Sequence, residues 1–168
     1  MTLDCLIRDK NAFFESARLR YHGITPDDAA KIVEWRGDRR IYRFFLSRAP
    51  VTMEEHLAWF RKYLTDASRF DFMVTEKASG RKVGTVGLQN LSGASADLSY
   101  LIDVGSQGLG FGSEAIRAMS AYAFEHFGLQ NLSAVILVGN SSSVGAAERA
   151  GYRLFSQTYR LERPGKGG

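Results

Sequence analysis

The first part of the chain passes from an alternating pattern to helical spacing. Apolar and polar residues alternate over residues 18–24 (RLRYHGI), which predicts a strand. Residues 25–28 (TPDD) supply an N-cap, a proline at the first helical position and acids in the first turn. We therefore expect a helix that runs through Trp35. Residues 39–47 are ambiguous and favour a second short helix.

A capping box opens the next predicted helix. Residues 52–55 (TMEE) place a threonine at the N-cap and a glutamate at N3, so that each caps a backbone N–H group. Beyond them Leu57, Phe60 and Leu64 fall on one helical face, with Trp59 alongside. We expect that face to pack against the core.

The middle of the chain has the pattern of three strands. Residues 70–76 (FDFMVTE), 82–90 (KVGTVGLQN) and 96–104 (ADLSYLIDV) are rich in apolar and β-branched side chains. The segments KASGRK and LSGAS separate them and have the composition of hairpin loops. This pattern predicts an antiparallel meander.

A glycine-rich turn divides the meander from the last elements. Gly108, Gly110 and Gly112 precede a helix that is expected to end near Phe127. Residues 131–138 (NLSAVILV) form a nearly continuous apolar run, which predicts a strand buried on both faces. Two further elements are then expected: a short helix over residues 140–151 and a last strand over residues 152–161. The order of elements predicts an α+β fold.

The composition favours one ordinary globular domain over residues 1–168, with residues 1–14 as an N-terminal extension and residues 163–168 as a flexible tail. The net charge is +4, and the densest basic stretch, residues 36–43, contains an aspartate. We therefore expect no nucleic-acid partner. The one cysteine, Cys5, excludes an intrachain disulfide, and no apolar run has the length of a membrane span. These features predict a cytoplasmic protein.

The glycine turn has the chemistry of an anion site. The first turn of a helix carries unpaired N–H groups and the positive end of the helix dipole, and glycines let the backbone approach a ligand. A P-loop is excluded because GFGSEA lacks its lysine. A dinucleotide fingerprint is excluded because Ser113 replaces its third glycine. Phosphate or pyrophosphate binding and a tight turn without a ligand are the two readings left open.

A resemblance to a known family narrows this choice. Residues 107–112 (QGLGFG) match Q/R-x-x-G-x-G/A, the acyl-CoA signature of the GNAT N-acetyltransferases. Residues 140–152 are similar to the N-x-x-S…E-x-x-G-F/Y segment of the same superfamily. Residues 15–21 and 27–45 resemble the opening of the branch that contains ribosomal-protein alanine N-acetyltransferases. Residues 34–60 resemble nucleotide-linked amino-sugar N-acetyltransferases.

The resemblance implies a central mixed, mostly antiparallel sheet that is splayed between two parallel strands, residues 96–104 and 131–138, and flanked by helices. It also implies acetyl-CoA as cosubstrate, without a metal. The pantetheine arm would lie between the splayed strands, and the pyrophosphate would lie on the glycine turn. The implied coenzyme-binding residues are Ile102, Val104, Gln107, Gly108, Leu109, Gly110, Phe111, Gly112, Ser113 and Asn140.

The family chemistry is direct attack of a primary amine on the thioester, which needs a base for the ammonium proton. Asp97 is the candidate base, because it lies where the alanine-acetylating branch usually has a glutamate. A solvated strand carboxylate is the alternative. Ala147 occupies the position of the usual thiolate-protonating tyrosine. The alanine-acetylating branch also tends to lack that tyrosine, and there the serine of the N-x-x-S motif is given the role, so the resemblance implies Ser143 as the candidate acid. A helix-capping role is the alternative for Ser143.

The acceptor is left open between a nucleotide-linked amino sugar or other small amine and a protein N-terminal amine. Candidate acceptor residues are Trp35, Arg36 and His56, with a core tryptophan and a helix-surface histidine as the alternatives. A non-catalytic acyl-CoA-binding sensor or scaffold is a further alternative, because Ala147 replaces the usual acid.

The C-terminus departs from the family pattern. Only 16 residues follow Tyr152, enough for one strand and a tail, whereas GNAT chains usually form a hairpin there. Either residues 3–8 or a second subunit would have to cover the exposed sheet edge. A homodimer is therefore one of the expectations.

Overall fold

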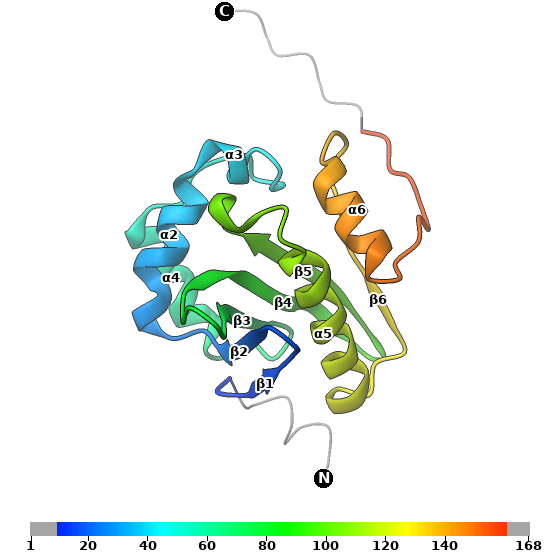
Figure 1. Cartoon of the computed structure of the whole chain (residues 1–168), viewed down its shortest axis with the longest axis horizontal. Helices are drawn as coiled ribbons and strands as arrows, with labels where there is room; N and C mark the ends of the chain where they lie inside the picture. The colour runs from blue at the N-terminus through cyan, green and yellow to red at the C-terminus, as the bar shows by residue number, and fades with distance from the viewer. Residues whose placement is uncertain (1–9, 161–168) are drawn as a thin grey trace, which may run out of the picture.

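The structure, a computed structural model, describes residues 10–160 (Figure 1). They form a six-stranded sheet in the order β1-β2-β3-β4-β5-β6. Neighbours from β1 to β5 are antiparallel, and β5 and β6 are parallel. This confirms the predicted mixed, mostly antiparallel sheet. The strands are β1 Phe13–Glu15, β2 Leu19–Gly23, β3 Phe70–Glu76, β4 Lys82–Ser92, β5 Ser95–Ile102 and β6 Asn131–Ser133.

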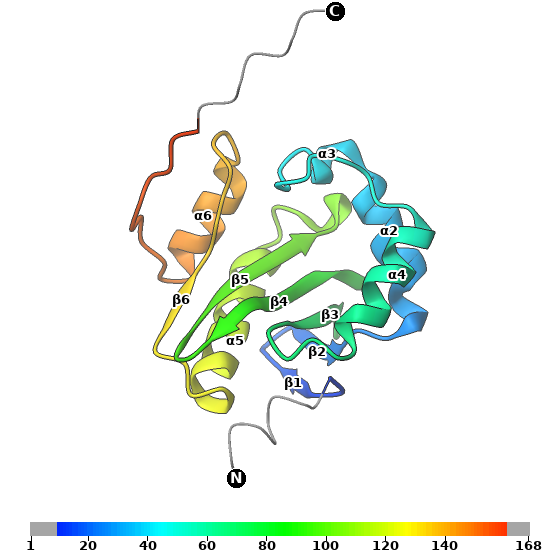
Figure 2. The ribbon, with the colours of Figure 1, turned by 180° about the vertical axis from the view of Figure 1, so that it is seen from behind.

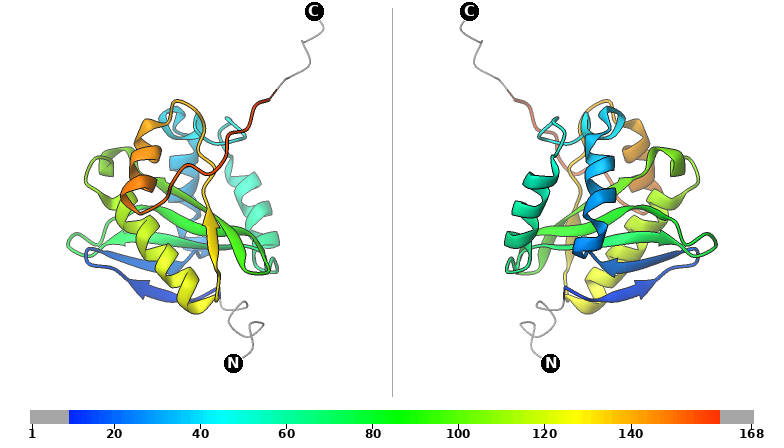
Figure 3. Two further views of the ribbon diagram at one scale, coloured as in Figure 1. Left: turned by 90° about the vertical axis from the view of Figure 1, so that its right-hand side faces the viewer. Right: turned by 90° about the vertical axis from the view of Figure 1, so that its left-hand side faces the viewer.

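Helices cover both faces of this sheet. Viewed edge-on, the sheet lies between α5 on one side and α2 and α4 on the other (Figure 3). The helices predicted from the N-caps and from the glycine turn are all present. The described helices are η1 Pro26–Asp28, α2 Ala29–Gly37, α3 Arg39–Tyr42, α4 Met53–Tyr63, η2 Val104–Ser106, α5 Phe111–His126 and α6 Ser141–Arg149. Of these η2 was not predicted, and it contains Val104, which was expected at the end of the strand over residues 96–104.

Two apolar clusters hold these layers together. Alternation along β3 sends Phe72 into the cluster beneath α5 and Met73 into the cluster beneath α2 and α4. The second cluster also contains Trp35, Phe60 and Leu101. Burial of such side chains is the main favourable contribution to folding. The face under α2 and α4 is therefore a packed layer of the molecule.

Strand β1 was not predicted. Its three residues are too few to show a periodic pattern, and the sequence analysis assigned two of them to an N-terminal extension. In the structure the Phe14 ring stacks between Tyr21 and Tyr122, with centroid distances of 4.4 and 4.3 Å. The sheet thus begins at Phe13. Residues 3–8, proposed to cover the far edge, and the tail at residues 163–168 lie outside the described residues.

The two parallel strands part after a short contact. β5 and β6 pair at Ser95–Asn131, Ala96–Leu132 and Asp97–Ser133, and their pairing ends there. β5 nevertheless continues to Ile102. Figure 2 shows the two strands diverging beyond this point, where the chain leads from β6 towards α6. The predicted splay between parallel strands is confirmed.

The prediction of a buried strand over residues 131–138 is wrong beyond Ser133. β6 ends there, and Val135 is 71% exposed. β6 is the last strand of the described sheet, so the apolar run has a neighbour on one side only.

The strand predicted over residues 152–161 is also absent from its described part, residues 152–160, which has no regular structure. Leu154, Phe155 and Tyr159 are exposed there. An alternating pattern forms a strand only when a ladder partner is available.

Helix α4 forms where the capping box predicts it, but it buries a different face. Thr52 Oγ1 accepts a hydrogen bond from the Glu55 N–H group, as expected. Leu57 and Leu64 are exposed, whereas His56, Phe60 and Tyr63 are buried. Among residues 10–160, no helix combines the length and apolar character needed to cross a membrane.

Candidate coenzyme and acceptor site

The glycine turn requires glycine at particular positions. Gly108 and Gly110 have φ angles of +77° and +81°, which is left-handed backbone that favours glycine, and Gly110 is the N-cap of α5. Gly112 lies inside α5, where a Cβ atom would lie 3.4 Å from the Tyr100 ring, an ordinary van der Waals distance, so this position does not require glycine. The turn therefore exposes backbone at the start of a 16-residue helix.

Side chains from other elements brace this turn. Gln107 Nε2 donates a hydrogen bond of 3.1 Å to the Ile102 carbonyl at the end of β5. Arg18 donates 2.9 Å to the Leu109 carbonyl and forms a 2.7 Å ion pair with Glu114. Its guanidinium also lies 4.8 Å from the centre of the Phe111 ring. The turn is thus held rigid before any ligand arrives.

Helix α6 contributes the opposite wall. Asn140 is its N-cap, and Asn140 Oδ1 accepts a 3.3 Å hydrogen bond from the Ser143 N–H group. Arg149, at the other end, donates a 3.0 Å hydrogen bond to the hydroxyl of Ser113 in the first turn of α5. Arg18 and Arg149 were not singled out from the sequence, because nothing in their neighbours marks them. Only the fold brings both guanidinium groups to the glycine turn.

Ser143 also contacts β5. Burial raises the pKa of Tyr100, and the neighbouring Ser143 side chain acts on it in the opposite direction. Ala147 is buried on the same helix, and its methyl side chain has no proton to donate. A protonated hydroxyl pair thus lies between β5 and α6.

Asp97 lies where the parallel strands part. Its neighbours Ala96 and Leu98 belong to the core beneath α5, so by strand alternation Asp97 faces the side covered by α2 and α4. It pairs in register with Ser133, and Asn90 Nδ2 donates a 2.8 Å hydrogen bond to its carboxylate. Asp97 is half-buried. The orientation needed for a base acting at the splay is therefore present.

The three candidate acceptor residues lie on the α2 and α4 side. The expectation of a surface histidine is wrong, because His56 is only 4% exposed and its ring lies 5.3 Å from Trp59. Burial and the charge of Arg36 lower the pKa of His56. Trp35 is 2% exposed in the core, as its alternative reading predicted. The Arg36 guanidinium lies 4.2 Å from the centre of the Phe45 ring.

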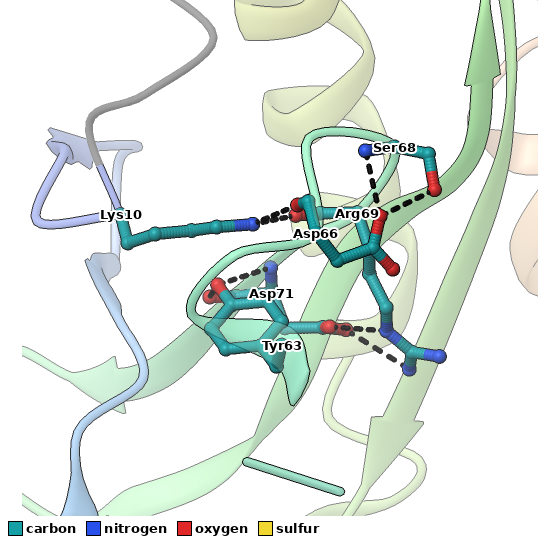
Figure 4. A network of polar contacts seen from close by, with 6 residues as sticks. All are labelled: Lys10, Tyr63, Asp66, Ser68, Arg69 and Asp71. Carbon is teal, nitrogen blue, oxygen red and sulfur yellow. Dashed lines mark hydrogen bonds and ion pairs between the residues drawn. The ribbon is translucent and has the colours of Figure 1, made fainter. Parts of the chain in front are cut away.

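A buried polar cluster on this side was not predicted (Figure 4). Asp71 is 8% exposed and forms a 2.6 Å ion pair with Arg69 Nε. The Tyr63 hydroxyl accepts 3.1 Å from the Asp71 N–H group, and Lys10 Nζ donates 2.6 Å to the Asp66 carbonyl. Burial raises the pKa of Asp71. These residues fix the floor beneath the acceptor side.

Gly87 keeps space for that carboxylate. A Cβ atom at Gly87 would lie 2.6 Å from Asp71 Oδ1, so no larger residue fits there without displacing the side chain. Gly87 pairs with Asp71 on β3 and with Ser99 on β5. The Asp71 carboxylate therefore lies against β4. Among residues 10–160, no three potential metal ligands gather at a common point.

The comparisons with known proteins agree with this geometry. Residues 18–153 match the family model described as the acetyltransferase (GNAT) domain. An uncharacterized protein of Methanocaldococcus jannaschii is 25% identical over 143 residues, which cover 83% of this chain and 29% of that protein. A probable N-acetyltransferase of Bacillus subtilis is 29% identical over 96 residues, which cover 55% of this chain and 53% of that protein. The chain therefore spans only part of the length of both relatives.

Solved structures share the fold. Spermidine N-acetyltransferase from Vibrio cholerae, solved with CoA and spermine, aligns with a TM-score of 0.75 at 21% identity, over 81% of each chain. A domain from Methanocaldococcus jannaschii aligns at 0.74 and 23% identity, over 85% of this chain and 93% of that one. A putative ribosomal-protein-serine acetyltransferase from Vibrio cholerae aligns at 0.69 and 25% identity, over 84% and 83%. With the family model matching most of its length, this chain belongs to the GNAT acetyltransferase family.

Proposed function

We propose that this chain is an acetyl-CoA-dependent N-acetyltransferase that moves an acetyl group to a primary amine. The observation that carries the proposal is the left-handed glycine turn at Gly108 and Gly110, placed between the parted strand β5 and the N-terminus of α5. A helix N-terminus with accessible amides binds phosphate groups. The parted strands supply the adjoining space for the pantetheine arm.

The coenzyme would be held mainly by backbone. Its pyrophosphate lies on the amides of residues 107–112 and on the Ser113 hydroxyl, with Arg149 beside it. The pantetheine amides pair with backbone groups of Ile102 and Val104. Asn140 donates from its side-chain amide, because its Oδ1 atom already accepts from Ser143.

The acyl transfer follows from these positions. Asp97 takes a proton from the acceptor ammonium, directly or through a water molecule, and the amine nitrogen attacks the thioester carbon. The C–N bond forms, the C–S bond breaks, and the thiolate takes a proton from the Ser143 hydroxyl. The second proton of the attacking nitrogen passes through water to the Ser143 oxygen, so that Ser143 is restored and one proton remains on Asp97. This route replaces the tyrosine whose position Ala147 occupies.

The acceptor would enter from the α2 and α4 side, where Arg36 is half-buried and the Trp35 and His56 side chains are buried beneath the surface. A nucleotide-linked amino sugar or other small amine and a protein N-terminal amine are the two acceptor classes proposed. A location in the cytoplasm is part of the same proposal. So is a homodimer, for which the exposed apolar run after β6 is the support.

The second candidate function is an acyl-CoA-binding sensor or scaffold without turnover. The burial of Ala147 at the usual acid position favours it. The two functions share the coenzyme site and differ only in chemistry. An amine-dependent release of CoA separates them.

The test is acetyl transfer to a panel of amines, followed by CoA release and by product mass. The wild type should acetylate at least one amine, and Gly110→Trp should acetylate none, because the indole fills the coenzyme site. Gly93→Trp is the matched control, since Gly93 also has a positive φ angle, +57°, but lies in the β4–β5 hairpin. Acetyl-CoA binding without turnover on any amine would support the sensor instead. Equal turnover by both tryptophan variants would contradict the proposed site.

A further inference from the structure

The net charge of the chain is concentrated in one short segment. Residues 36–48 contain five arginines and one aspartate, a surplus of four positive charges. The formal net charge of the whole chain is also +4, so the remaining residues are balanced overall. The segment spans the end of α2, all of α3 and the loop beyond it. Figures 1 and 2 show α3 at the end of α2, apart from α5.

Most of these arginines have no carboxylate partner. Arg40 pairs with Asp38 at 2.6 Å, which uses the one acid in the segment. Glu34 pairs with Lys31 at 2.8 Å. Among residues 10–160, neither Arg36 nor Arg39 forms an ion pair, and the same holds for Arg43 and Arg48. Like charges held together without counter-charges repel, so the segment favours the arrival of an anion.

Two donors at the base of the segment are buried without an acceptor. The Nε atom of Arg36 and the Nε1 atom of Trp35 have no hydrogen-bond partner. A buried donor left unpaired costs free energy, and native structures rarely keep one without a reason. Burial and the nearby Arg69 guanidinium lower the pKa of Arg36. An acceptor oxygen would relieve both the missing hydrogen bond and the repulsion.

The exposed arginines border an open hollow. Arg39, Arg40 and Arg43 line this space on the surface of α3, mainly with the carbon atoms of their side chains. Guanidinium groups bind carboxylates and phosphates in two-point geometry, so arginine is well suited to such a site.

We propose that the acceptor carries an anionic oxygen group, a phosphate or a carboxylate, that binds to Arg36, Arg39 and Arg43. This inference rests on the proposed acetyltransferase function and specifies its substrate class. It selects an anionic amine and disfavours polycations. The coenzyme phosphates have their own site at the glycine turn, where Arg149 bonds to Ser113.

The first experiment measures acceptor choice with pairs of amines that differ in charge. Glucosamine is compared with glucosamine 6-phosphate, and Ala-Gln amide with Ala-Glu amide, so that the pairs distinguish phosphate from carboxylate; spermidine represents polycations. We expect kcat/KM to favour the anionic member of at least one pair by about tenfold or more, the effect of one charge-assisted hydrogen bond. Equal use of both members in each pair, or a preference for spermidine, would overturn the proposal.

Variants locate the effect. Arg36→Gln and, separately, the double change Arg39→Gln/Arg43→Gln should remove the anion preference without changing acetyl-CoA affinity. The double variant changes exposed side chains only, so it remains informative if Arg36→Gln folds poorly. Arg61→Gln/Lys62→Gln on the exposed side of α4 removes the same charge and should keep the preference. The proposed anion site is contradicted if the preference for anionic acceptors persists in both arginine variants. It is also contradicted if these variants lose acetyl-CoA affinity and not that preference.

A direct binding readout does not depend on turnover. In a ¹⁵N-labelled protein, glucosamine 6-phosphate or Ala-Glu amide should shift the Arg36 Nε–H and Trp35 Nε1–H resonances, while the neutral partners should not. Unmoved resonances with all anions would overturn the proposal. If acetyl-CoA fails to bind and no amine is acetylated while these resonances still shift, the proposed function fails and the anion site stands. The two failures are therefore distinguishable.

Discussion

The proposed coenzyme side and acceptor side of the site use different chemical groups. The coenzyme side relies on backbone, with left-handed glycines at Gly108 and Gly110 and the amides at the start of α5. The acceptor side relies on side chains, with the buried Asp71–Arg69 pair below and unpaired arginines such as Arg36 above. Backbone groups are the same in every sequence, so they suit a ligand shared by a whole family. Side chains vary, so they suit the ligand that distinguishes one member.

The proposed coenzyme side and acceptor side also differ in charge balance. Arg18 at the glycine turn is paired with Glu114, and Arg149 is bonded to Ser113. On the proposed acceptor side, the five arginines of residues 36–48 have one acid to offset them. A balanced turn suits a ligand that exchanges every cycle. The unbalanced charge is the basis of the acceptor selectivity that we propose.

The largest expected effect is a loss of stability at the buried Asp71 cluster on the α2 and α4 side. Gly87→Val should reduce the free energy of unfolding by about 3 kcal/mol or more, because its Cβ meets both the Phe70 carbonyl and Asp71, and the backbone cannot yield. Urea unfolding measures this. Gly37→Val is the matched control, since nothing lies within 4 Å of its Cβ position. Equal stability of the two variants would mean that β3 and β4 are not packed as described.

The next effect concerns the junction of the two sides. Asp97→Asn should lower kcat by about a hundredfold, within the usual range for loss of a general base, while leaving acetyl-CoA affinity unchanged. Asp27→Asn, an exposed change of the same kind in η1, should have no effect on rate. Full activity in Asp97→Asn would mean that Asp97 is a solvated strand carboxylate and not the base.

A smaller effect is expected on the coenzyme side. Ser143→Ala should lower kcat by about tenfold, less than general acids usually contribute, because a thiolate already leaves readily. Its acetyl-CoA affinity should stay within about twofold, since the capping bond of Asn140 goes to the Ser143 backbone. Ser142→Ala provides the neighbouring exposed control. An unchanged kcat for Ser143→Ala would leave the thiolate to be protonated by solvent.

The smallest effect is a pH dependence of stability. Burial lowers the pKa of Lys10 from 10.5 to about 8, so the unfolded chain holds more protons than the folded one between these values. Stability contributed by this group should therefore rise as pH increases from 8 to 10.5. Relative to Lys10→Met, the wild type should gain about 1 kcal/mol over that range, after allowance for solvent screening. A relative loss with rising pH would contradict the burial of Lys10.

The coenzyme side could be predicted from the sequence because its signal is local. Glycine at positions 108 and 110 reflects the backbone angles of those residues alone, and a helix start needs only the residues around it. The splay between the strands followed from the family resemblance and not from the residues themselves. Arg149 was missed because its role depends on where α6 packs.

The acceptor side was less predictable because its signals are tertiary. Helical spacing located α4 but did not choose its buried face, since Leu57 and His56 are adjacent and only packing decides between them. The FDFMVTE pattern concealed Asp71, because β3 is buried on both faces and an acid there needs a partner. Arg69 supplies that partner two residues earlier. The strand predicted over residues 152–161 is absent from residues 152–160 for a related reason. Its alternating pattern has no neighbouring strand to pair with.

The most direct test of the two-sided account is calorimetry of acetyl-CoA with three proteins: the wild type, Gly110→Trp and Arg36→Gln. The account predicts that the wild type binds, that Gly110→Trp does not bind while remaining folded, and that Arg36→Gln binds as the wild type does. This pattern would place the coenzyme on the backbone turn and leave Arg36 to the acceptor. Failure of the wild type to bind, unchanged binding by Gly110→Trp, or loss of binding in a folded Arg36→Gln would contradict it.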